Sequence, residues 1–322
     1  MRKILPKCTG LMVNTYYVYS RYRNMFNIRE KLGFPGVVFT DSGGFQQSMK
    51  STFGRKTKVS RYTQEKVLRD QISLGSDFAA SLDFPLNPMS TSSRNRIRIR
   101  RSLANLEHAV ALAQSLKANT KVVPVVHGYD REMIRFTFKQ IEKLEDELSY
   151  YFPVIAVGSL VPLYADRSNA GSTRLIEAFR AMLEYVPSGR AIHVMGAGSP
   201  LSMRFYYWLG ANSLDTRSWV TNAVFGKLVM PKYSRGRVHI NVLIRHFGSK
   251  ARLCNCPVCR TSQLRDLARS RMARAAHNAF VYLREFTQIK REMREGTFWE
   301  TTSQLLRDRV FYRRIMNHAP RS

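Results

Sequence analysis

The sequence is short of acidic residues and of long apolar runs, and each shortage excludes a class of protein. Its 322 residues include 23 Asp and Glu against 52 Lys and Arg, for a formal net charge of +29. No apolar run approaches the roughly 20 residues that a membrane-spanning helix needs, so we expect no membrane partner. The N-terminal segment MRKILPKCTG is charged and has no long apolar stretch, which argues against a signal peptide. We therefore expect a cytoplasmic protein.

Cysteine is also scarce, and its placement is uneven. The chain has four cysteines: Cys8 stands alone, whereas Cys254, Cys256 and Cys259 fall within six positions. A disulfide framework would spread its cysteines along the chain, so the pattern excludes a secreted disulfide scaffold. Clustering of this kind indicates a metal site. Cys8 lies outside the cluster, and we assign it no role.

The cysteine cluster CNCPVC has the spacing C-x-C-x2-C, and thiolates with imidazoles are the usual ligands of structural zinc. We predict His277, 18 positions after Cys259, as the fourth ligand, with His246 as the alternative. Four protein ligands leave no open position, so we expect one structural Zn²⁺ per chain. The competing interpretation is three reduced surface thiols, which would be prone to oxidation.

The excess of positive charge indicates a polyanionic partner, because a surface this basic repels itself. Nucleic acid fits this charge better than an anionic membrane surface does. Three basic segments are candidates for phosphate contacts: Arg94–Arg101, Lys232–Arg237 and Arg265–Arg274. The alternative for the first of them, RNRIRIRR, is a solvated helix face.

Strand-like and helix-like stretches alternate along the chain, with no internal repeat and no low-complexity linker. The expected strands span residues 36–40, 77–84, 121–128, 152–160 and 191–198, followed by a short segment at 212–216. The expected helices span residues 63–75, 93–116, 131–148, 172–186 and 199–211. Such a series predicts an α/β fold with a parallel sheet, either doubly wound or a (β/α)8 barrel.

The residues at the strand ends favour the barrel, because barrel enzymes carry their sites at the carboxyl ends of the strands. Six such residues recur along the chain: Asp41, Asp83, His127, Gly158, Met195 and Asp215. We therefore predict a (β/α)8 TIM-like catalytic barrel over residues 1–250. Residues 251–322 are expected to form a zinc-binding subdomain with basic C-terminal helices that packs on the barrel.

Several segments, taken in order, resemble the tRNA-guanine transglycosylase superfamily. Within GVVFTDSGGFQQ (36–47), FTDSGGFQ is similar to the strand-end D-S-G-G-[FY]-Q motif of that family. SLDFPLNP, VVHGYDRE, AVGSL and HVMGAGSP resemble its second acidic, base-reading, Gly-Gly-Leu and Met-Gly-x-Gly-x-Pro segments. The C-x-C-x2-C cluster with its later His-Asn resembles the zinc subdomain. The match covers residues 36–280, and the D-S-G-G-F-Q motif with the zinc pattern is its most specific part.

The resemblance implies a base exchange that replaces a guanine of a polynucleotide by a 7-deazaguanine. It implies Asp215 as the nucleophile that attacks C1′ and forms a covalent glycosyl-enzyme, and Asp41 as the general acid/base. Asp83 would accept hydrogen bonds from the guanine edge. The remaining residues that the resemblance assigns to substrate binding are Ser42, Phe45, Gln46, His127, Gly158 and Met195. Among them, Phe45 and Met195 would sandwich the flipped base, and Gly158 would offer its backbone amide.

Three features depart from the family pattern. His127 replaces a Gln, and because a protonated ring nitrogen can also donate to a purine O6, the change bears on which deazaguanine is accepted. The nucleophile segment DTRSWVTNAVFGKL lacks the Asp-Cys-Val-x-Pro-Thr-Arg pattern of bacterial queuine-type enzymes and is closer to the archaeosine-type D-S-x-x-Y segment. The third departure is the spacing from Cys259 to His277, which is short for the family.

Asp77 and Asp166 are weaker candidates than Asp215 for the role of nucleophile.

The kind of nucleic acid stays open at this point. The short zinc loop, the high charge and the lack of a visible extra RNA-binding domain favour a compact member that modifies DNA, with tRNA as the alternative. Two further alternatives are a non-catalytic, zinc-stabilised nucleic-acid-binding protein and a glycosylase that only removes the base. Family members often dimerise through the zinc region, so a homodimer is a further expectation.

Overall fold

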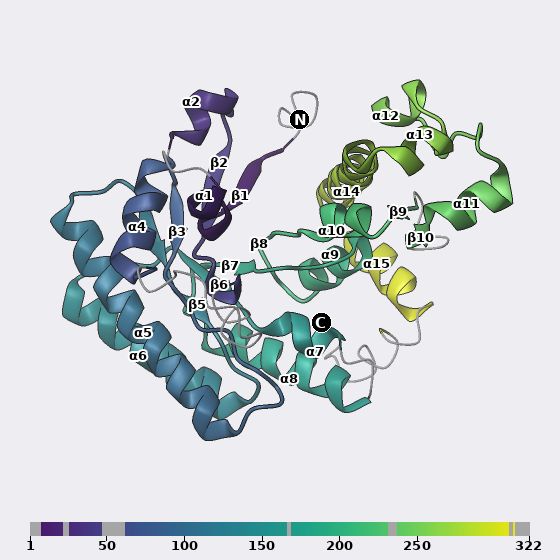
Figure 1. Cartoon of the computed structure of the whole chain (residues 1–322). Coiled ribbons are helices and arrows are strands. Elements are labelled where there is room, and N and C mark those ends of the chain that lie inside the picture. Colours follow the sequence, from purple (N-terminus) through teal and green to yellow (C-terminus); the bar gives the residue numbers. More distant parts are fainter. Residues whose placement is uncertain are drawn as a thin grey trace. The chain divides into compact units, whose positions relative to one another are not determined.

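A computed structural model of the chain (Figure 1) describes residues 8–21, 26–46, 62–165, 169–230, 237–308 and 312. The described residues form two compact units. The sheet unit comprises Thr9–Met195 and Leu209–Asp215, and the helical unit comprises Gly196–Trp208 and Thr216–Asp308. The expected domain boundary at residue 250 stays a prediction. Among the described residues, no helix is both long and apolar enough to cross a membrane.

The strands of the sheet unit pair in parallel and in chain order, as β1-β2-β3-β4 and β5-β6-β7-β8. They are β1 (Gly10–Asn14), β2 (Val37–Asp41), β3 (Phe78–Ala80), β4 (Lys121–Val123), β5 (Val125–Val126), β6 (Val154–Val157), β7 (Ala191–Val194) and β8 (Ser213–Leu214). This sequential order differs from that of a doubly wound sheet, which reverses its order at a switch point.

Pro124 divides what is otherwise a single strand into β4 and β5. Proline has no N–H to donate to a ladder, but its carbonyl accepts a hydrogen bond from Ala156 N at 2.9 Å. β4 therefore pairs with β3 and β5 pairs with β6, so that the two sheets meet along one extended segment.

The sheet unit curves around a core of inward side chains. Phe39, Val123, Val125 and Ala156 are buried together on this inner side. The ring of Phe39 on β2 also stacks on His193 of β7, with the ring centroids 4.6 Å apart. The expected parallel α/β architecture is confirmed, whereas a closed eight-stranded barrel is not, because no pairing of β8 with β1 is seen in the described residues.

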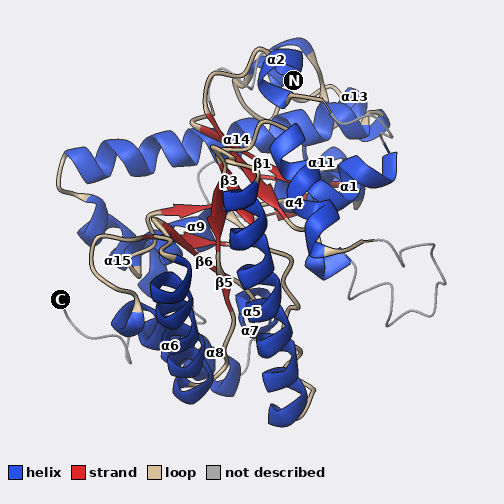
Figure 2. Ribbon diagram, turned by 90° about the vertical axis from the view of Figure 1, so that its left-hand side faces the viewer, coloured by secondary structure: helices blue, strands red, loops and turns tan. Residues whose placement is uncertain are grey.

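Helices pack on the outside of this sheet. They are α1 (Thr15–Arg21), α2 (Ile28–Leu32), α4 (Gln64–Ser73), α5 (Ser92–Ser115), α6 (Arg131–Leu148), α7 (Leu160–Ala165) and α8 (Asn169–Tyr185). Figure 2 shows α5, α6 and α8 running side by side along the strands. The buried residues of α6 include Ile134, Phe138 and Ile141, at the spacing of one helix face. Side chains of Thr63, Thr91 and Asp130 cap the helices that follow them.

The strand expected over residues 77–84 ends early, at Ala80. Beyond it, the backbone leaves the ladder because side chains of the covering helices satisfy its donors. Leu82 N donates to Gln64 Oε1 at 2.6 Å, and Phe84 N donates to Ser102 Oγ at 2.9 Å. This replacement of strand pairing by side-chain hydrogen bonds fixes the loop that carries Asp83.

The helical unit combines a small antiparallel hairpin with helices. Its elements are α9 (Pro200–Trp208), α10 (Ser218–Val224), β9 (Lys227–Val229), β10 (Arg237–His239), α11 (Ile240–Phe247), α12 (Pro257–Thr261), α13 (Leu264–Arg269), α14 (Arg271–Arg294) and α15 (Phe298–Arg307). Leu228, Leu243, Leu264 and Leu267 are buried in one cluster, which also contains Cys259. The expected C-terminal helices are confirmed, and α14 is the element to which most of the unit attaches.

A buried ion cluster joins three helices of the helical unit. Arg204 on α9 is 1% exposed and donates to Glu285 and, at 2.5 Å, to Glu292, both on α14. Its guanidinium also donates to Thr302 Oγ1 of α15 at 3.2 Å. The planar, multidentate guanidinium suits this arrangement, because one group satisfies acceptors from two other helices.

We predict that Arg204→Met destabilises the protein by about 3–5 kcal/mol, because it leaves two buried carboxylates without their cation. Combining it with Glu285→Gln and Glu292→Gln should recover much of this loss. Urea unfolding followed by circular dichroism measures both, with the exposed Arg294→Met as a matched control on α14. A single variant as stable as this control would contradict the assignment of the cluster.

Candidate functional site

The structure brings the six predicted strand-end residues to one edge of the sheet unit. Asp41 is the last residue of β2, and Asp83 lies three residues beyond β3. The other four directly follow strands β5, β6, β7 and β8, in this order: His127, Gly158, Met195 and Asp215. Because the strands are parallel, their carboxyl ends share an edge, and residues far apart in sequence gather there.

Asp41 is held from both sides by β1 and by its own motif. Asn14, the last residue of β1, donates from Nδ2 to Asp41 Oδ2 and also, at 3.0 Å, to Gln46 Oε1. Gly43 N donates to Asp41 Oδ1 at 3.1 Å, and Thr15 Oγ1 donates to the Asp41 carbonyl at 2.8 Å. Both carboxylate oxygens are thereby oriented. The sequence analysis did not predict β1 or Asn14, although GLMVN is an apolar run that ends on a polar residue, as GVVFTD does.

Burial raises the pKa of Asp41 to about 7, and the negative charges of Asp83 and Asp215 add to the rise. The hydrogen bonds from Gly43 and Asn14 act against it, because they favour the ionised form. A carboxyl group with a pKa near neutrality can give and take a proton at little cost, which is the property of a general acid/base.

The two glycines of the motif are required by protein packing. A Cβ at Gly43, whose φ is +82°, would lie 2.3 Å from Tyr16 Cβ, and one at Gly44 would lie 2.1 Å from the Asp83 carbonyl oxygen. Tyr62 also donates to the Ser42 carbonyl in this turn. The motif therefore needs glycine so that the chain can pass between neighbouring segments.

Asp83 is buried, with 5% of its surface exposed, and two residues engage its carboxylate. Ser42 Oγ donates to Oδ1 at 2.7 Å, while Gly44 N donates to that same Ser42 oxygen at 3.1 Å. On the other side, His127 Nε2 lies 3.1 Å from Asp83 Oδ2. Ser42, which the resemblance assigns to substrate binding, contacts Asp83 directly in the structure.

Both ring nitrogens of His127 face protein groups. Nδ1 lies 2.9 Å from Ser159 Oγ, and Nε2 faces Asp83. Leu86 N donates to Ser159 Oγ at 2.8 Å, and this backbone contact holds the hydroxyl beside His127 Nδ1. Its ring also fills the place of a side chain at Gly158, where an added Cβ would lie 2.5 Å from His127 Cε1.

Gly158 and the two expected base-contacting side chains differ in their surroundings. The N–H of Gly158 donates to Val126 O at 3.0 Å, so this amide is engaged in the sheet. Phe45 is 54% exposed, whereas Met195 is half-buried and packs against the inner core of the sheet unit. An exposed ring beside a carboxylate is a surface on which a planar base can stack.

Asp215 has a buried histidine beside it that sequence reasoning missed. His193 on β7 is 5% exposed, and its Nε2 lies 3.5 Å from Asp215 Oδ1. Its Nδ1 lies 2.9 Å from Ser213 Oγ of β8. The signal was present in AIHV, where a polar residue interrupts a buried strand. The competitor Asp77 lies at the other end of β3, where it pairs with Arg29 and accepts from Val38 N, and Asp166 lies outside the described residues.

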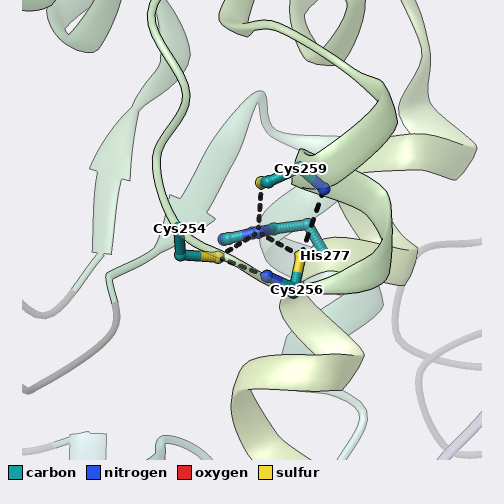
Figure 3. A group of neighbouring side chains, drawn as sticks. All are labelled: Cys254, Cys256, Cys259 and His277. Carbon is teal, nitrogen blue, oxygen red and sulfur yellow. Dashed lines mark hydrogen bonds between the residues drawn. The ribbon is translucent and has the colours of Figure 1, made fainter.

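In the helical unit, the three clustered cysteines and His277 form a group that could hold a metal ion (Figure 3). Their four ligand atoms lie within 4.8 Å of one another. The Sγ atoms of Cys254, Cys256 and Cys259 lie 3.8, 3.6 and 3.3 Å from His277 Nδ1. Cys254 and Cys256 come from the segment before α12, Cys259 lies in α12 itself, and the histidine comes from α14. The alternative ligand, His246, lies on α11 outside this group, with its ring against Phe247.

Neighbouring backbone groups orient these side chains. His277 Nε2 donates to the Val229 carbonyl at 3.1 Å, which turns Nδ1 toward the sulfurs. Cys256 N lies 3.5 Å from Cys254 Sγ, and Cys259 N lies 3.3 Å from Cys256 Sγ. Such outer hydrogen bonds fix ligand orientation at metal sites and stabilise thiolate charge.

The basic segments are only partly available to a polyanion. In Arg94–Arg101, Arg96 pairs with Glu132 at 2.7 Å, Arg98 donates to the Pro85 carbonyl at 2.7 Å, and Arg101 lies over the Phe84 ring. Several arginines of this segment thus support the sheet unit itself.

In Arg265–Arg274, Arg274 is buried against backbone carbonyls, whereas Arg265, Arg269 and Arg271 are exposed. Most of Lys232–Arg237 lies outside the described residues.

We predict that Gly44→Ala destabilises the protein by about 1–3 kcal/mol, because the new Cβ meets the backbone of Asp83 and the crowded chain must move. Gly10→Ala on β1 is the matched control, since its Cβ meets nothing closer than 3.4 Å. Urea unfolding compares the two variants. Equal stability of the two would show that the close approach of Gly44 to Asp83 is not a packing constraint.

Comparisons with a family model and with individual known proteins point to the same family. The chain matches the family model described as queuine tRNA-ribosyltransferase over residues 2–310. It is 22% identical over 317 residues to the tRNA-guanine(15) transglycosylase of Methanococcus aeolicus, which covers 94% of this chain and 45% of the relative. It is 25% identical over 321 residues to the enzyme of that name from Aeropyrum pernix, covering 95% and 56%.

A third relative, the tRNA-guanine(15) transglycosylase of Methanosarcina mazei, is 26% identical over 305 residues, covering 92% of this chain and 57% of the relative. The chain thus spans about half of the length of these relatives. The family match itself extends over nearly the whole sequence and includes both the sheet-edge carboxylates and the cysteine group. The chain belongs to the queuine tRNA-ribosyltransferase family.

Proposed function

We propose that this chain is a guanine transglycosylase that exchanges a guanine in tRNA for a 7-deazaguanine base. The observation that carries the proposal is the gathering of Asp41, Asp83 and Asp215 at one sheet edge, with the pKa of Asp41 raised to about 7. Carboxylates repel phosphates, so a purely polyanion-binding protein has no use for such a group. Family membership supports the same reaction class.

The relatives favour tRNA as the substrate. The three relatives named above are all tRNA-guanine(15) transglycosylases. The sequence alone favoured DNA, on the short zinc loop and the high charge. No comparison supports that preference, and the relatives fit the tRNA alternative better. A homodimer and a cytoplasmic location stay predictions.

In the proposed mechanism, a carboxylate oxygen of Asp215 attacks C1′ of the target nucleoside. The C1′–N9 bond breaks, and the Asp41 carboxyl group gives its proton to the leaving guanine. The second half-reaction reverses these roles: Asp41 takes the N9 proton of the incoming base, the new C1′–N9 bond forms, and Asp215 is released. One proton is exchanged in each direction, so no cofactor is consumed.

The base would bind beside Asp83, at the same edge. A base inside a folded polynucleotide is out of reach of these side chains, so the nucleotide must leave its stack. Asp83 has lone pairs that can accept from a guanine edge, and its position is fixed by Ser42 and His127. Phe45 would supply one stacking surface and Met195 the other. His127 acts in this proposal through Asp83, because its ring nitrogens face Ser159 and Asp83.

We further propose that the cysteine group holds one structural Zn²⁺. A tetrahedral ion with Zn–S bonds of about 2.3 Å and Zn–N bonds of about 2.0 Å separates sulfur from nitrogen by about 3.5 Å. The observed separations of 3.3 to 3.8 Å from His277 Nδ1 match this value. With four protein ligands, the ion would tie the segment before α12 to α14 and would take no part in the chemistry.

Exchange of radiolabelled guanine tests the reaction and the substrate together. Purified protein is offered bulk tRNA and duplex DNA in parallel, with Asp215→Ala as the control. We expect label to enter tRNA, and we expect the variant to be inactive because no covalent intermediate can form. Label in DNA alone would replace tRNA by DNA as the substrate. Binding without label in either nucleic acid would support a non-catalytic protein, and abasic sites without added base would indicate a glycosylase.

The pH dependence tests Asp41. Formation of the covalent intermediate needs Asp41 protonated, and its pKa is about 7. We therefore expect the single-turnover rate of adduct formation to be constant below pH 6 and to fall about tenfold per pH unit above pH 7. Quench experiments with trapping of the protein–tRNA adduct measure this rate. Asp41→Asn should be slow and should lose this descending limb; a variant that keeps it would assign the limb to another group.

Metal analysis tests the zinc proposal. We expect one zinc per chain, and we expect Cys259→Ser to lose it together with several degrees of thermal stability, because a structural metal contributes directly to folding. Cys8→Ser is the matched control, since Cys8 lies outside the group and should change neither quantity. A Cys259→Ser protein that retains the wild-type melting temperature after zinc loss would overturn a structural role.

A further inference from the structure

His193 is a buried polar residue in a strand where an apolar side chain would be expected. It points to the inner side of the sheet unit, where its ring stacks on Phe39 with the ring centroids 4.6 Å apart. Leaving a polar group without a partner in such a place costs free energy. Its Nδ1 is engaged with Ser213 Oγ at 2.9 Å. Nε2 makes no hydrogen bond of ordinary geometry to any described residue, and it faces Asp215 Oδ1 at 3.5 Å.

Three elements therefore converge on this ring. Stacking on Phe39 of β2 fixes the plane of the ring, and the contact of Nδ1 with Ser213 of β8 fixes its orientation within that plane. Nε2 is then directed at the carboxylate of Asp215, which follows β8. Since Nδ1 and Nε2 lie on opposite sides of an imidazole ring, occupying Nδ1 with a hydroxyl aims the other nitrogen. A core histidine that merely filled space would not need both of its nitrogens directed in this way.

A second group at the same edge has the same arrangement. Ser159, His127 and Asp83 repeat the order hydroxyl, imidazole, carboxylate, with Nδ1 at 2.9 Å from Ser159 Oγ and Nε2 at 3.1 Å from Asp83 Oδ2. Asp41 differs, because its partner is the neutral amide of Asn14. Two of the three carboxylates thus each face a serine–histidine pair, whereas the third faces an amide.

We propose that His193 is a positioning residue for Asp215. Its Nε2–H donates to Asp215 Oδ1 and holds the carboxylate so that Oδ2 is the oxygen presented to C1′. This inference rests on the proposed function, because it gives Asp215 the role of nucleophile. His193 keeps its proton throughout: the Oδ2–C1′ bond forms, the C1′–N9 bond breaks, and the proton that N9 gains comes from Asp41.

The expected benefit is orientation. A carboxylate can rotate about its Cβ–Cγ bond, and an attacking atom displaced by about 1 Å can cost a reaction about 100-fold in rate. The donor also lowers the repulsion between Asp215 and the other carboxylates of the site, whose charges influence one another. A donor fixed by Phe39 and Ser213 does this without having to reorganise during the reaction.

Two substitutions separate positioning from packing. His193→Phe keeps a ring against Phe39 but has no N–H to donate, whereas His193→Gln places its amide nitrogen near the position of Nε2. We expect His193→Phe to lower kcat of guanine exchange by about 100-fold with KM for tRNA unchanged. His193→Gln should restore most of that rate. Melting temperatures of both variants, measured in parallel, identify any loss that comes from misfolding.

Several outcomes would overturn the inference. A wild-type rate for His193→Phe would remove the need for the donor. Equal losses in the folded Phe and Gln variants would assign the effect to the shape of the ring. A rise in KM with unchanged kcat would place His193 in substrate binding.

A spectroscopic readout separates this inference from the proposed function. In ¹⁵N-labelled wild-type protein, we expect the neutral His193 ring to carry its proton on Nε2, and Asp215→Asn should shift that nitrogen. If the wild-type protein exchanges no guanine into any nucleic acid, the proposed function fails on that result alone. A His193 ring with its proton on Nδ1, or one insensitive to Asp215→Asn, would overturn the pairing whether or not the protein is active.

Discussion

The close approach of three carboxylates at the carboxyl edge of one parallel sheet is the constraint on which the candidate site depends. Like charges in a partly buried site cannot all be ionised without support, and the structure supplies each with a different neighbour. Asp83 and Asp215 each face a buried histidine, while Asp41 faces the neutral amide of Asn14. Burial, and after it the charges of Asp83 and Asp215, raises the pKa of Asp41 to about 7, which supports its proposed role as the proton carrier.

Close packing keeps the neighbours of the three carboxylates in place. The D-S-G-G turn brings Ser42 against Asp83 and lets the backbone at Gly43 and Gly44 pass Tyr16 and Asp83 at distances that no side chain would permit. Gly158 likewise leaves room for the ring of His127, because it has no side chain. These glycines are therefore required by contacts within the protein. A side chain at any of them would overlap a neighbouring residue, such as His127 or Asp83.

The helical unit relies on polar anchors of another kind. Its apolar cluster is small, and α14 is joined to its surroundings by Arg204 with two glutamates and by the group of three cysteines and His277. The Arg204 cluster links α9, α14 and α15, and the cysteine group, which could hold a metal ion, brings the segment around α12 beside α14. The basic residues that remain exposed on this unit, including Arg265, Arg269 and Arg271, are available to phosphate groups.

Features that depend on local spacing could be predicted from the residues alone. Alternating apolar and polar stretches predicted the main strands and helices, the polar residues after strands predicted the site edge, and C-x-C-x2-C predicted the metal ligands. His277 was predicted as the fourth ligand with His246 as the alternative, and the fold places His277, not His246, beside the three cysteines. Sequence reasoning missed β1, and with it Asn14, although GLMVN ends on a polar residue as GVVFTD does.

Which groups face one another depends on long-range packing and could not be predicted from local patterns. The partners of the carboxylates, namely Asn14, His127 and His193, come from strands separated by up to about 180 positions, and no local pattern records which side chains meet across a curved sheet. Local patterns likewise do not record that the Gly158 N–H donates to a backbone carbonyl of the sheet, or that arginines of α5 bind other groups of the protein. Residue types set the available chemistry, whereas long-range packing sets each group's neighbours and therefore its charge and orientation.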